Sequence, residues 1–350
     1  MLRKIRLVTV ASPFIPLLLS LAALSTMAQV GVWIEKGSPP SPAYGGYGEA
    51  IVGTGQRIYA IRGYSTGTCQ YWRYNPATND WTTLMSWTPG SDPPPDPPRP
   101  KTGTAFAWNS GDSIYVLLGA AYSDPNRRYF YQYTISSNSW QRLADTPHAQ
   151  GAGDAIAWSG YDDMIYAILG SNQHGTVFCR YVPGTNSWQT ITLNPTWTVT
   201  DDGASLVWAG GEYLYALRGE WEETDPHNDF ARYHIPTGTW QNLSPIPVTN
   251  GVGDGASLLW IGNWIVEHSD YIFALGGNDV LENPGCGFYR HSISGNSWID
   301  LEKIPYPVGY YVGNRLGFAA GQIYYWQGAP STWSGGGTKF CMFQFSTTLT

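Results

Sequence analysis

The feature that most constrains this chain is a unit of about 50 residues that occurs six times. The unit is clearest over residues 202–243, where four short runs are rich in aromatic and branched side chains and are separated by Gly, Pro, Asn or Thr. Runs of this composition predict β-strands. Four strands repeated at this interval predict the blade of a β-propeller.

Three independent markers keep the same register along the chain. A glycine precedes each first run, and the six are Gly48, Gly103, Gly153, Gly203, Gly255 and Gly313. A glycine ends each second run, four residues after an aromatic side chain, at Gly63, Gly119, Gly170, Gly219, Gly277 and Gly328. A tryptophan opens the fourth run at Trp81, Trp140, Trp188, Trp240 and Trp298. Their agreement predicts an all-β, six-bladed propeller of four-stranded antiparallel blades.

The sixth tryptophan of the fourth runs is expected near the start of the sequence. Trp33 begins WIEKGSPP, which is similar to WIDLEKIPYP at Trp298, and it lies 48 residues before Trp81. We therefore expect the strand around Trp33 to complete the last blade and close the ring. Closure of this kind removes a sheet edge that would otherwise pair with another chain.

Two segments resemble a known family of repeats. RYNPATNDW, residues 73–81, resembles the turn between the third and fourth strands of Kelch repeats, and IFALGG, residues 272–277, resembles the Kelch second strand with its glycine pair. The other five repeats have a single glycine at that place. The chain thus resembles a divergent Kelch-repeat β-propeller of the type found as the central domain of galactose oxidase. This resemblance implies the fold, whereas propellers host many unrelated functions.

Residues 1–28 have the features of a secretory signal peptide. Arg3, Lys4 and Arg6 precede an apolar stretch over residues 14–24, and Thr-Met-Ala follows as a cleavage site. The alternative is an uncleaved membrane anchor, for which the apolar stretch is short. We expect cleavage, no membrane insertion afterwards, a secreted, periplasmic or cell-surface location, and one propeller over residues 29–350.

Charge narrows the class of partner. Without residues 1–28 the chain has 16 Lys and Arg against 26 Asp and Glu, a net charge of −10. Non-specific nucleic-acid binding needs basic contacts to phosphates, so no nucleic-acid partner is expected. A closed ring favours a monomer.

The four cysteines fall near third strands. Cys179 and Cys341 occupy matched positions, and so do Cys69 and Cys286. Neither matched pair comes from adjacent blades, which favours buried thiols over disulfides.

Polar residues stand at the entry to every first strand. They are Glu49, Thr104, Asp154, Asp202, Asp254 and Asn314. We call this end of the propeller the loop face; it also carries the loops between second and third strands, where binding sites commonly lie. Asp154, Asp202 and Asp254 are candidate ligands of calcium, which prefers several oxygen ligands, or candidate partners of sugar hydroxyls. Alternatively, each aspartate caps a tight turn. No other cofactor is predicted.

Two further groups of side chains are candidates for binding. His148, His174 and His227 fall in loops of the loop face, beside the acids of the insertion over residues 220–229, which suits either a transition-metal site or a solvated acidic loop. Aromatic residues expected in loops could stack on sugars, grip a peptide or fold back into the core. They are Trp87, Tyr122, Trp197, Trp221, Tyr310, Tyr311 and Trp333.

The sequence favours a secreted or cell-surface recognition protein that binds carbohydrate or protein on the loop face. Its predicted ligand-binding residues are Glu49, Asp154, Asp202, Asp254, Asn314, Arg315, Trp221 and His227. The family resemblance also implies an alternative, because exported Kelch-like propellers include sialic acid mutarotases; Glu49, Asp154 and Arg315 would then supply acid–base groups. A third hypothesis is a structural surface protein without a small ligand. Whether the chain is an enzyme is left open, and no catalytic residue is assigned.

Overall fold

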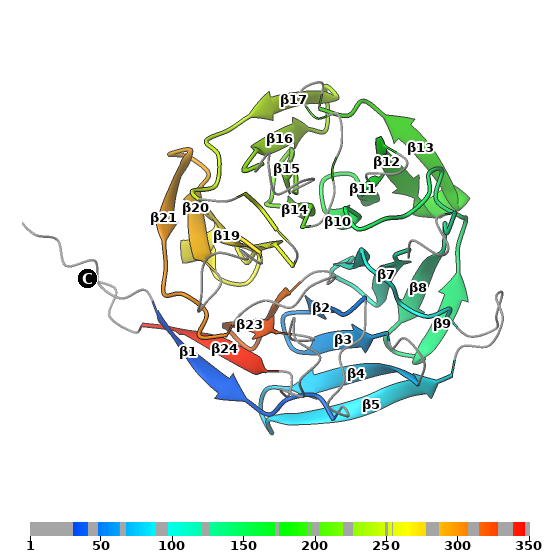
Figure 1. The fold of residues 1–350 in the computed structure, drawn as a ribbon, viewed down its shortest axis with the longest axis vertical. Helices are drawn as coiled ribbons and strands as arrows, with labels where there is room; N and C mark the ends of the chain where they lie inside the picture. Colours follow the sequence, from blue (N-terminus) through cyan, green and yellow to red (C-terminus); the bar gives the residue numbers. More distant parts are fainter. Residues whose placement is uncertain are drawn as a thin grey trace, which may run out of the picture.

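A computed structural model of the chain describes residues 31–40, 48–63, 68–88, 97–120, 126–171, 175–194, 197, 200, 203–219, 227–248, 251–253, 255–277, 287–306, 315–327 and 339–346. Over these residues the strands form six four-stranded antiparallel sheets, which are arranged around a central axis (Figure 1). The prediction of an all-β, six-bladed propeller is confirmed.

In blades 1 to 5 the strands follow chain order from the axis outwards, as Figure 1 shows for β2 to β5. Blade 1 contains β2 (Ala50–Gly53), β3 (Ile58–Arg62), β4 (Cys69–Asn75) and β5 (Asp80–Trp87). Blade 2 contains β6 (Thr104–Trp108), β7 (Ser113–Leu118), β8 (Phe130–Thr134) and β9 (Ser139–Arg142). Blade 3 contains β10 (Ala155–Ser159), β11 (Met164–Ser171), β12 (Gly175–Val182) and β13 (Ser187–Ile191).

The other three blades follow the same plan. Blade 4 contains β14 (Ser205–Trp208), β15 (Tyr213–Leu217), β16 (Phe230–His234) and β17 (Thr239–Asn242). Blade 5 contains β18 (Ser257–Trp260), β19 (Tyr271–Leu275), β20 (Phe288–Ser292) and β21 (Ser297–Asp300). Blade 6 contains β22 (Leu316–Ala319), β23 (Gln322–Trp326), β24 (Phe340–Phe345) and β1 (Gly31–Lys36). Short 3-10 turns lie at η1 (Pro183–Thr185) and η2 (Val266–His268).

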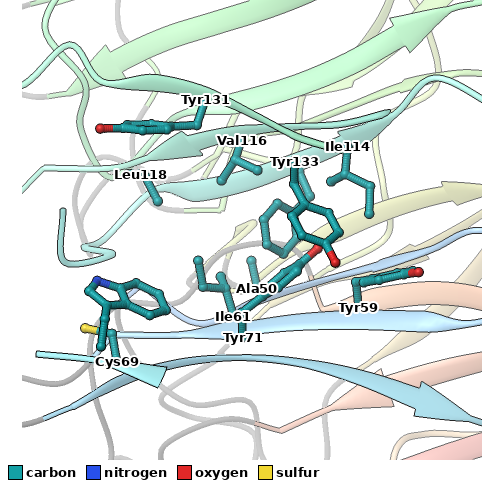
Figure 2. Packing of buried hydrophobic residues seen from close by; sticks show 12 residues of the cluster. Ala50, Tyr59, Ile61, Cys69, Tyr71, Ile114, Val116, Leu118, Tyr131 and Tyr133 are labelled. Atoms are coloured by element: carbon teal, nitrogen blue, oxygen red, sulfur yellow. The ribbon is translucent and has the colours of Figure 1, made fainter. Parts of the chain in front are cut away.

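The hydrophobic core lies between neighbouring blades. Figure 2 shows it between blades 1 and 2, where Tyr71 of β4 faces side chains of β7 and β8. The rings of Tyr71 and Tyr133 meet edge to face with centroids 4.7 Å apart. Aromatic pairs in this geometry stabilise by about 0.5–1.5 kcal/mol beyond the area they bury. This explains why the aromatic content is high without requiring that each ring contact a ligand.

The ring is closed in its outermost layer by β1, which lies antiparallel to β24 (Figure 1). The indole of Trp33 donates a 2.9 Å hydrogen bond to the Glu302 carbonyl, just beyond the outer strand of the preceding blade. Trp298 makes the same bond to Ser244 at 2.8 Å. Trp33 therefore takes the place in blade 6 that Trp298 takes in blade 5, and the predicted closure is confirmed.

A second closure joins blades 1 and 6 beside the axis. The Gly55 amide donates to the Phe318 carbonyl at 3.1 Å, and the Ala320 amide donates to the Gly55 carbonyl at 2.8 Å. A Cβ on Gly53 would overlap the backbone of Phe318. The close approach of the two backbones therefore requires glycine at position 53.

The first glycine marker has a steric origin. Gly103 and Gly203 have φ of 80° and 83°, in the left-handed region. A Cβ on either would overlap a carbonyl oxygen in the entry loop of the next blade, that of Gly151 or Gly253. Each glycine therefore permits both the sharp turn into the first strand and the close packing of neighbouring blades.

One expectation about side-chain position was wrong. Trp87 lies within β5 rather than in a loop, pairs with Cys69 and is buried, because β4 and β5 extend their ladder past a bulge at Tyr71 and Trp72. Trp197 lies outside the strands, and its burial against Trp240 at 5.6 Å agrees with the alternative that a loop aromatic folds back into the core. The signal-peptide segment, Cys286, Tyr122, Tyr310, Tyr311 and Trp333 lie outside the described residues.

The described thiols are buried, as the repeat register predicts. Cys69, Cys179 and Cys341 are all inaccessible. Burial raises the pKa of Cys179 above its ordinary value and raises the pKa of Cys341 to about 12. Over the ranges that the structure describes, no helix has the length and apolar character to span a membrane.

Candidate functional site

At the loop face, Asp154 is enclosed at the entry to blade 3. Its Oδ1 accepts a 3.2 Å hydrogen bond from the Gly170 amide, at the end of the second strand of the same blade. The side chain is 4% exposed. This geometry supports the alternative in which the aspartate ties together the turns of its own blade.

Glu49 and Arg315 lie together with Arg62 in a buried ionic cluster. Glu49 Oε1 is 3.8 Å from Arg62 Nε, and Glu49 Oε2 is 3.6 Å from Arg315 Nη2. Arg315 also donates to the Trp326 carbonyl at 3.3 Å. All three charged side chains are at most 2% exposed. The cluster joins blade 1 to blade 6, so it reinforces the closure of the ring beside the axis.

His227 belongs to a polar cluster at the base of the predicted acidic insertion. Its Nδ1 is 3.1 Å from Arg218 Nη1, which is also 3.1 Å from Asp229 Oδ2. Asp202, Trp221, Asp254 and Asn314 lie outside the described residues. Within the described ranges, no three His, Cys, Asp or Glu side chains gather as a metal site would require. Of the three predicted calcium ligands, Asp154 is the one that lies within the described residues.

The opposite end of the axis, which we call the turn face, carries the turns between first and second strands. Equivalent positions at the ends of β6, β10, β14 and β18 are all tryptophan. We call this group the tryptophan collar; it consists of Trp108, Trp158, Trp208 and Trp260. Their spacing of 50, 50 and 52 residues was visible in the sequence. The collar was not singled out from the sequence, because only the fourth-strand tryptophans served as markers of the repeat.

Each collar indole is held by the turn that follows its strand. The indole nitrogens donate at 2.8 Å from Trp108 to the Gly111 carbonyl, 2.7 Å from Trp158 to Asp163 Oδ1, 2.9 Å from Trp208 to the Gly211 carbonyl and 3.0 Å from Trp260 to the Ser269 carbonyl. Neighbouring rings then meet edge to face, with centroids 5.6 Å apart for Trp158 and Trp208 and 5.7 Å apart for Trp208 and Trp260. Because the four indole N–H groups are hydrogen-bonded within the protein, the collar presents mainly aromatic carbon at its surface.

Blades 1 and 6 depart from the collar pattern. Their equivalent residues are Gly53 and Phe318. The remaining place is occupied by Trp264, from the connection between β18 and β19, which we call the blade 5 arm (residues 261–270). Trp264 stacks on Phe318 with centroids 4.8 Å apart. A Cβ on Gly55 would overlap its indole. The arm therefore reaches from blade 5 across blade 6 to blade 1.

The base of the arm is anchored in the core. The His268 ring stacks on Phe345 with centroids 4.6 Å apart and meets Phe273 edge to face at 5.7 Å. Burial, assisted by the nearby Arg290 charge, lowers the pKa of His268 below its ordinary value. The imidazole is therefore neutral near neutral pH, which suits its apolar contacts.

A cavity of about 120 Å³ lies inside the collar at the end of the axis. Its apolar side chains come from matched positions of all six first strands, namely Ile51, Phe106, Ile156, Leu206, Leu258 and Leu316. Its mouth includes Ser110, Asn263 and Trp264, which are exposed on the turn face. A single water needs about 10–15 Å³, so the cavity has room for a larger group. The described lining includes no ionisable side chain, so it is suited to binding rather than to acid–base chemistry.

Three large hydrophobic side chains are exposed on the turn face. Tyr161 is 47% exposed, Trp264 is 37% exposed and Val266 is 76% exposed. All three belong to turns between first and second strands. In the described part of the chain the other large hydrophobic with comparable exposure is Val32 of β1, at 41%. The exposed large hydrophobics of the described residues therefore concentrate on the turn face, as is common at interaction surfaces.

Comparison with known proteins agrees with the repeat and the fold. The chain is 27% identical over 240 residues to the Kelch-like protein terF of Aspergillus terreus. The match covers 62% of this chain and 48% of that protein, so the chain matches about half the length of this curated relative. No family model matches the chain. Together, the six repeats, the closed six-bladed ring and this similarity support a Kelch-repeat β-propeller.

Proposed function

We propose that this propeller is an exported recognition protein that binds another protein through its turn face. The observation that carries the proposal is the exposure of Tyr161, Trp264 and Val266 in turns of this face, with Trp264 also lining the collar cavity. Partly exposed aromatic rings beside a pocket are typical anchors of protein interfaces. The similarity to a Kelch-like protein supports a binding role, and export rests on the signal peptide predicted at residues 1–28.

A protein partner suits the collar better than a glycan does. Sugar hydroxyls need hydrogen-bonding groups, but all four collar indoles donate within the protein. Carbohydrate binding at the loop face stays a separate prediction, which depends on Trp221 and on carboxylates that lie outside the described residues.

The proposal is tested by capture on the immobilised full chain from the extracellular fluid of the source organism. We expect a protein to be retained by the wild type and lost by a variant that combines Tyr161→Ser with Val266→Ser. Val32→Thr is the matched control, because Val32 is similarly exposed but lies on the outer strand of blade 6. Equal retention by all three proteins would contradict binding through the turn face.

Export is tested separately from binding. Fractionation of cells that produce the full chain is expected to find the protein outside the cytoplasm, with Gln29 as its first residue. A cytoplasmic protein that retains residues 1–28 would contradict export without bearing on the binding surface.

A further inference from the structure

We infer that the cavity inside the tryptophan collar is a binding site for a small neutral molecule, the size of a phenol, that combines one aromatic ring with one polar group. The site lies at the end of the axis, and it takes a free molecule rather than a segment of the protein partner. The volume of the cavity, the chemistry of its walls and the side chains at its mouth support this assignment.

The cavity has the volume and the walls of a site for one ring. Its volume is about 120 Å³. An engineered protein cavity of roughly 150 Å³ with walls of Leu, Ile and Phe binds benzene. The walls here are of the same kind, since each of the six first strands contributes Ile, Leu or Phe at a matched position. A bound ring would make the dispersion contacts that the walls of an empty cavity lack.

The walls favour a neutral molecule over a charged one. The described lining has no ionisable side chain, so a charged ligand would lose its hydration without gaining an ion pair. The indole N–H groups of the four collar tryptophans donate to residues of the turns rather than into the cavity. The side chains of the walls therefore offer mainly aliphatic and aromatic carbon.

Two polar side chains at the mouth can bind the polar group of the ligand. Ser110 of blade 2 and Asn263 of the blade 5 arm both line the cavity and are exposed. Among the described residues, neither side chain has a hydrogen-bond partner. A hydroxyl group on the ligand could therefore bond to one of them while the ring lies deeper in the cavity.

The position of Trp264 favours a free molecule over a side chain from a partner. Its ring centroid lies 4.8 Å from that of Phe318 in blade 6 and 6.0 Å from that of Trp108 in blade 2. Because these contacts hold the indole on both sides, it covers the part of the mouth next to blade 1. A small free molecule can pass beside this ring more readily than a side chain that carries a protein backbone with it.

The test uses fluorine NMR with the full chain and two matched probes. 4-Fluorophenol is neutral at neutral pH, whereas 4-fluorobenzoate has the same ring with a negative charge. The protein is expected to broaden the fluorine signal of the phenol, and excess unlabelled phenol is expected to restore it, while the benzoate signal stays sharp. A phenol signal that stays sharp, or equal broadening of both signals, would overturn the inference.

A change in the walls places the probe in the cavity. A variant that combines Ala107→Val with Ala157→Val reduces the volume, and valine already occupies the matched positions of blades 1 and 4, at Val52 and Val207. This variant is expected to weaken phenol binding roughly tenfold. Ala77→Val, in an exposed turn of blade 1, is the matched control and is expected to bind the phenol as the wild type does.

A change at the mouth provides a second variant that is expected to fold, because Asn263 is exposed. Asn263→Ala is expected to weaken phenol binding about two- to tenfold through loss of a hydrogen bond. Melting curves check that each variant is folded. Unchanged phenol binding by both Asn263→Ala and the valine variant would show that the phenol binds elsewhere and would overturn the assignment. Neither result bears on protein capture through Tyr161 and Val266, so the two proposals fail or stand separately.

Discussion

The indole of Trp264, from blade 5, stacks on the indole of Trp108, from blade 2, with ring centroids 6.0 Å apart and planes 11° apart. The contact crosses blades 6 and 1, whose collar positions are Phe318 and Gly53. Loss of one ring of the sixfold pattern in blade 1 thus leaves space that the blade 5 arm occupies. The collar is therefore completed by a side chain that does not belong to the repeat.

Trp264→Ala is expected to lower the free energy of unfolding by roughly 1–3 kcal/mol. Complete burial would make the cost of losing a tryptophan larger, at about 3–5 kcal/mol, but this ring is 37% exposed. Urea denaturation measures the change, and Val266→Ala on the same arm is the control because its side chain is 76% exposed and is expected to matter little. Equal stability of Trp264→Ala and the wild type would mean that the stack contributes nothing to the ring.

Glu49→Gln is expected to destabilise the fold by about 3–5 kcal/mol. The substitution leaves the buried Arg62 and Arg315 guanidinium groups without the carboxylate between them, and uncompensated buried charge is costly. Glu35→Gln is the matched control, since Glu35 pairs at 2.7 Å with the exposed Lys339, and little change is expected there. Chemical denaturation of both variants makes the comparison, and a similar small effect for the two would argue against a structural role of the buried cluster.

Alanine substitutions at three glycines distinguish the effect of backbone conformation on stability from the effect of packing. Gly103→Ala combines φ of 80° with overlap on the next blade, so a loss of more than about 2 kcal/mol is expected. Gly175→Ala has φ of 73° in open space, and about 1 kcal/mol is expected. Gly184→Ala, in open space without positive φ, is expected to be neutral or slightly stabilising. Urea denaturation ranks them, and a Gly103 variant no less stable than the Gly175 variant would contradict close packing of the blades at this turn.

Alkaline pH is expected to destabilise the protein. Burial raises the pKa of Tyr181 and of Tyr324 to about 12, and that of Cys341 to about 12, whereas the unfolded values are about 10 for tyrosine and about 8.5 for cysteine. Because the folded-state values are raised, this stability is complete below the unfolded pKa values and is lost as pH rises towards about 12.

The measurement is the melting temperature as a function of pH, followed together with the ultraviolet absorbance of phenolate. Phenolate from the buried tyrosines is expected to appear only as the protein unfolds. In Cys341→Ala the melting temperature is expected to fall less steeply between about pH 8.5 and 10, since one buried thiol no longer titrates. Buried phenols that ionise near pH 10 in a protein that is still folded would contradict the assignment.

Trp33 shows most clearly how much of the fold the sequence predicts. Its spacing and its flanking residues predicted that it would close the ring. An outer-strand tryptophan is held by strand pairing and by a carbonyl of the preceding blade, and blades 1, 3, 4 and 5 repeat the bond that Trp33 makes. Likewise, Gly48, Gly103, Gly203 and Gly255, before four of the first strands, mark a turn whose φ other residues rarely adopt. Periodicity in the sequence reports interactions that each repeat makes in the same way.

The repeat pattern therefore predicts the strands, their number per blade, the number of blades and the way in which the ring closes. The environment of individual side chains follows only from how the folded blades pack. Whether Glu49 meets solvent or two buried guanidinium groups, and whether Trp264 joins Trp108, depends on residues 266 and 156 positions away, brought together by the closed ring. Such contacts depend on how distant blades pack, and that packing is not encoded in the pattern of any single repeat.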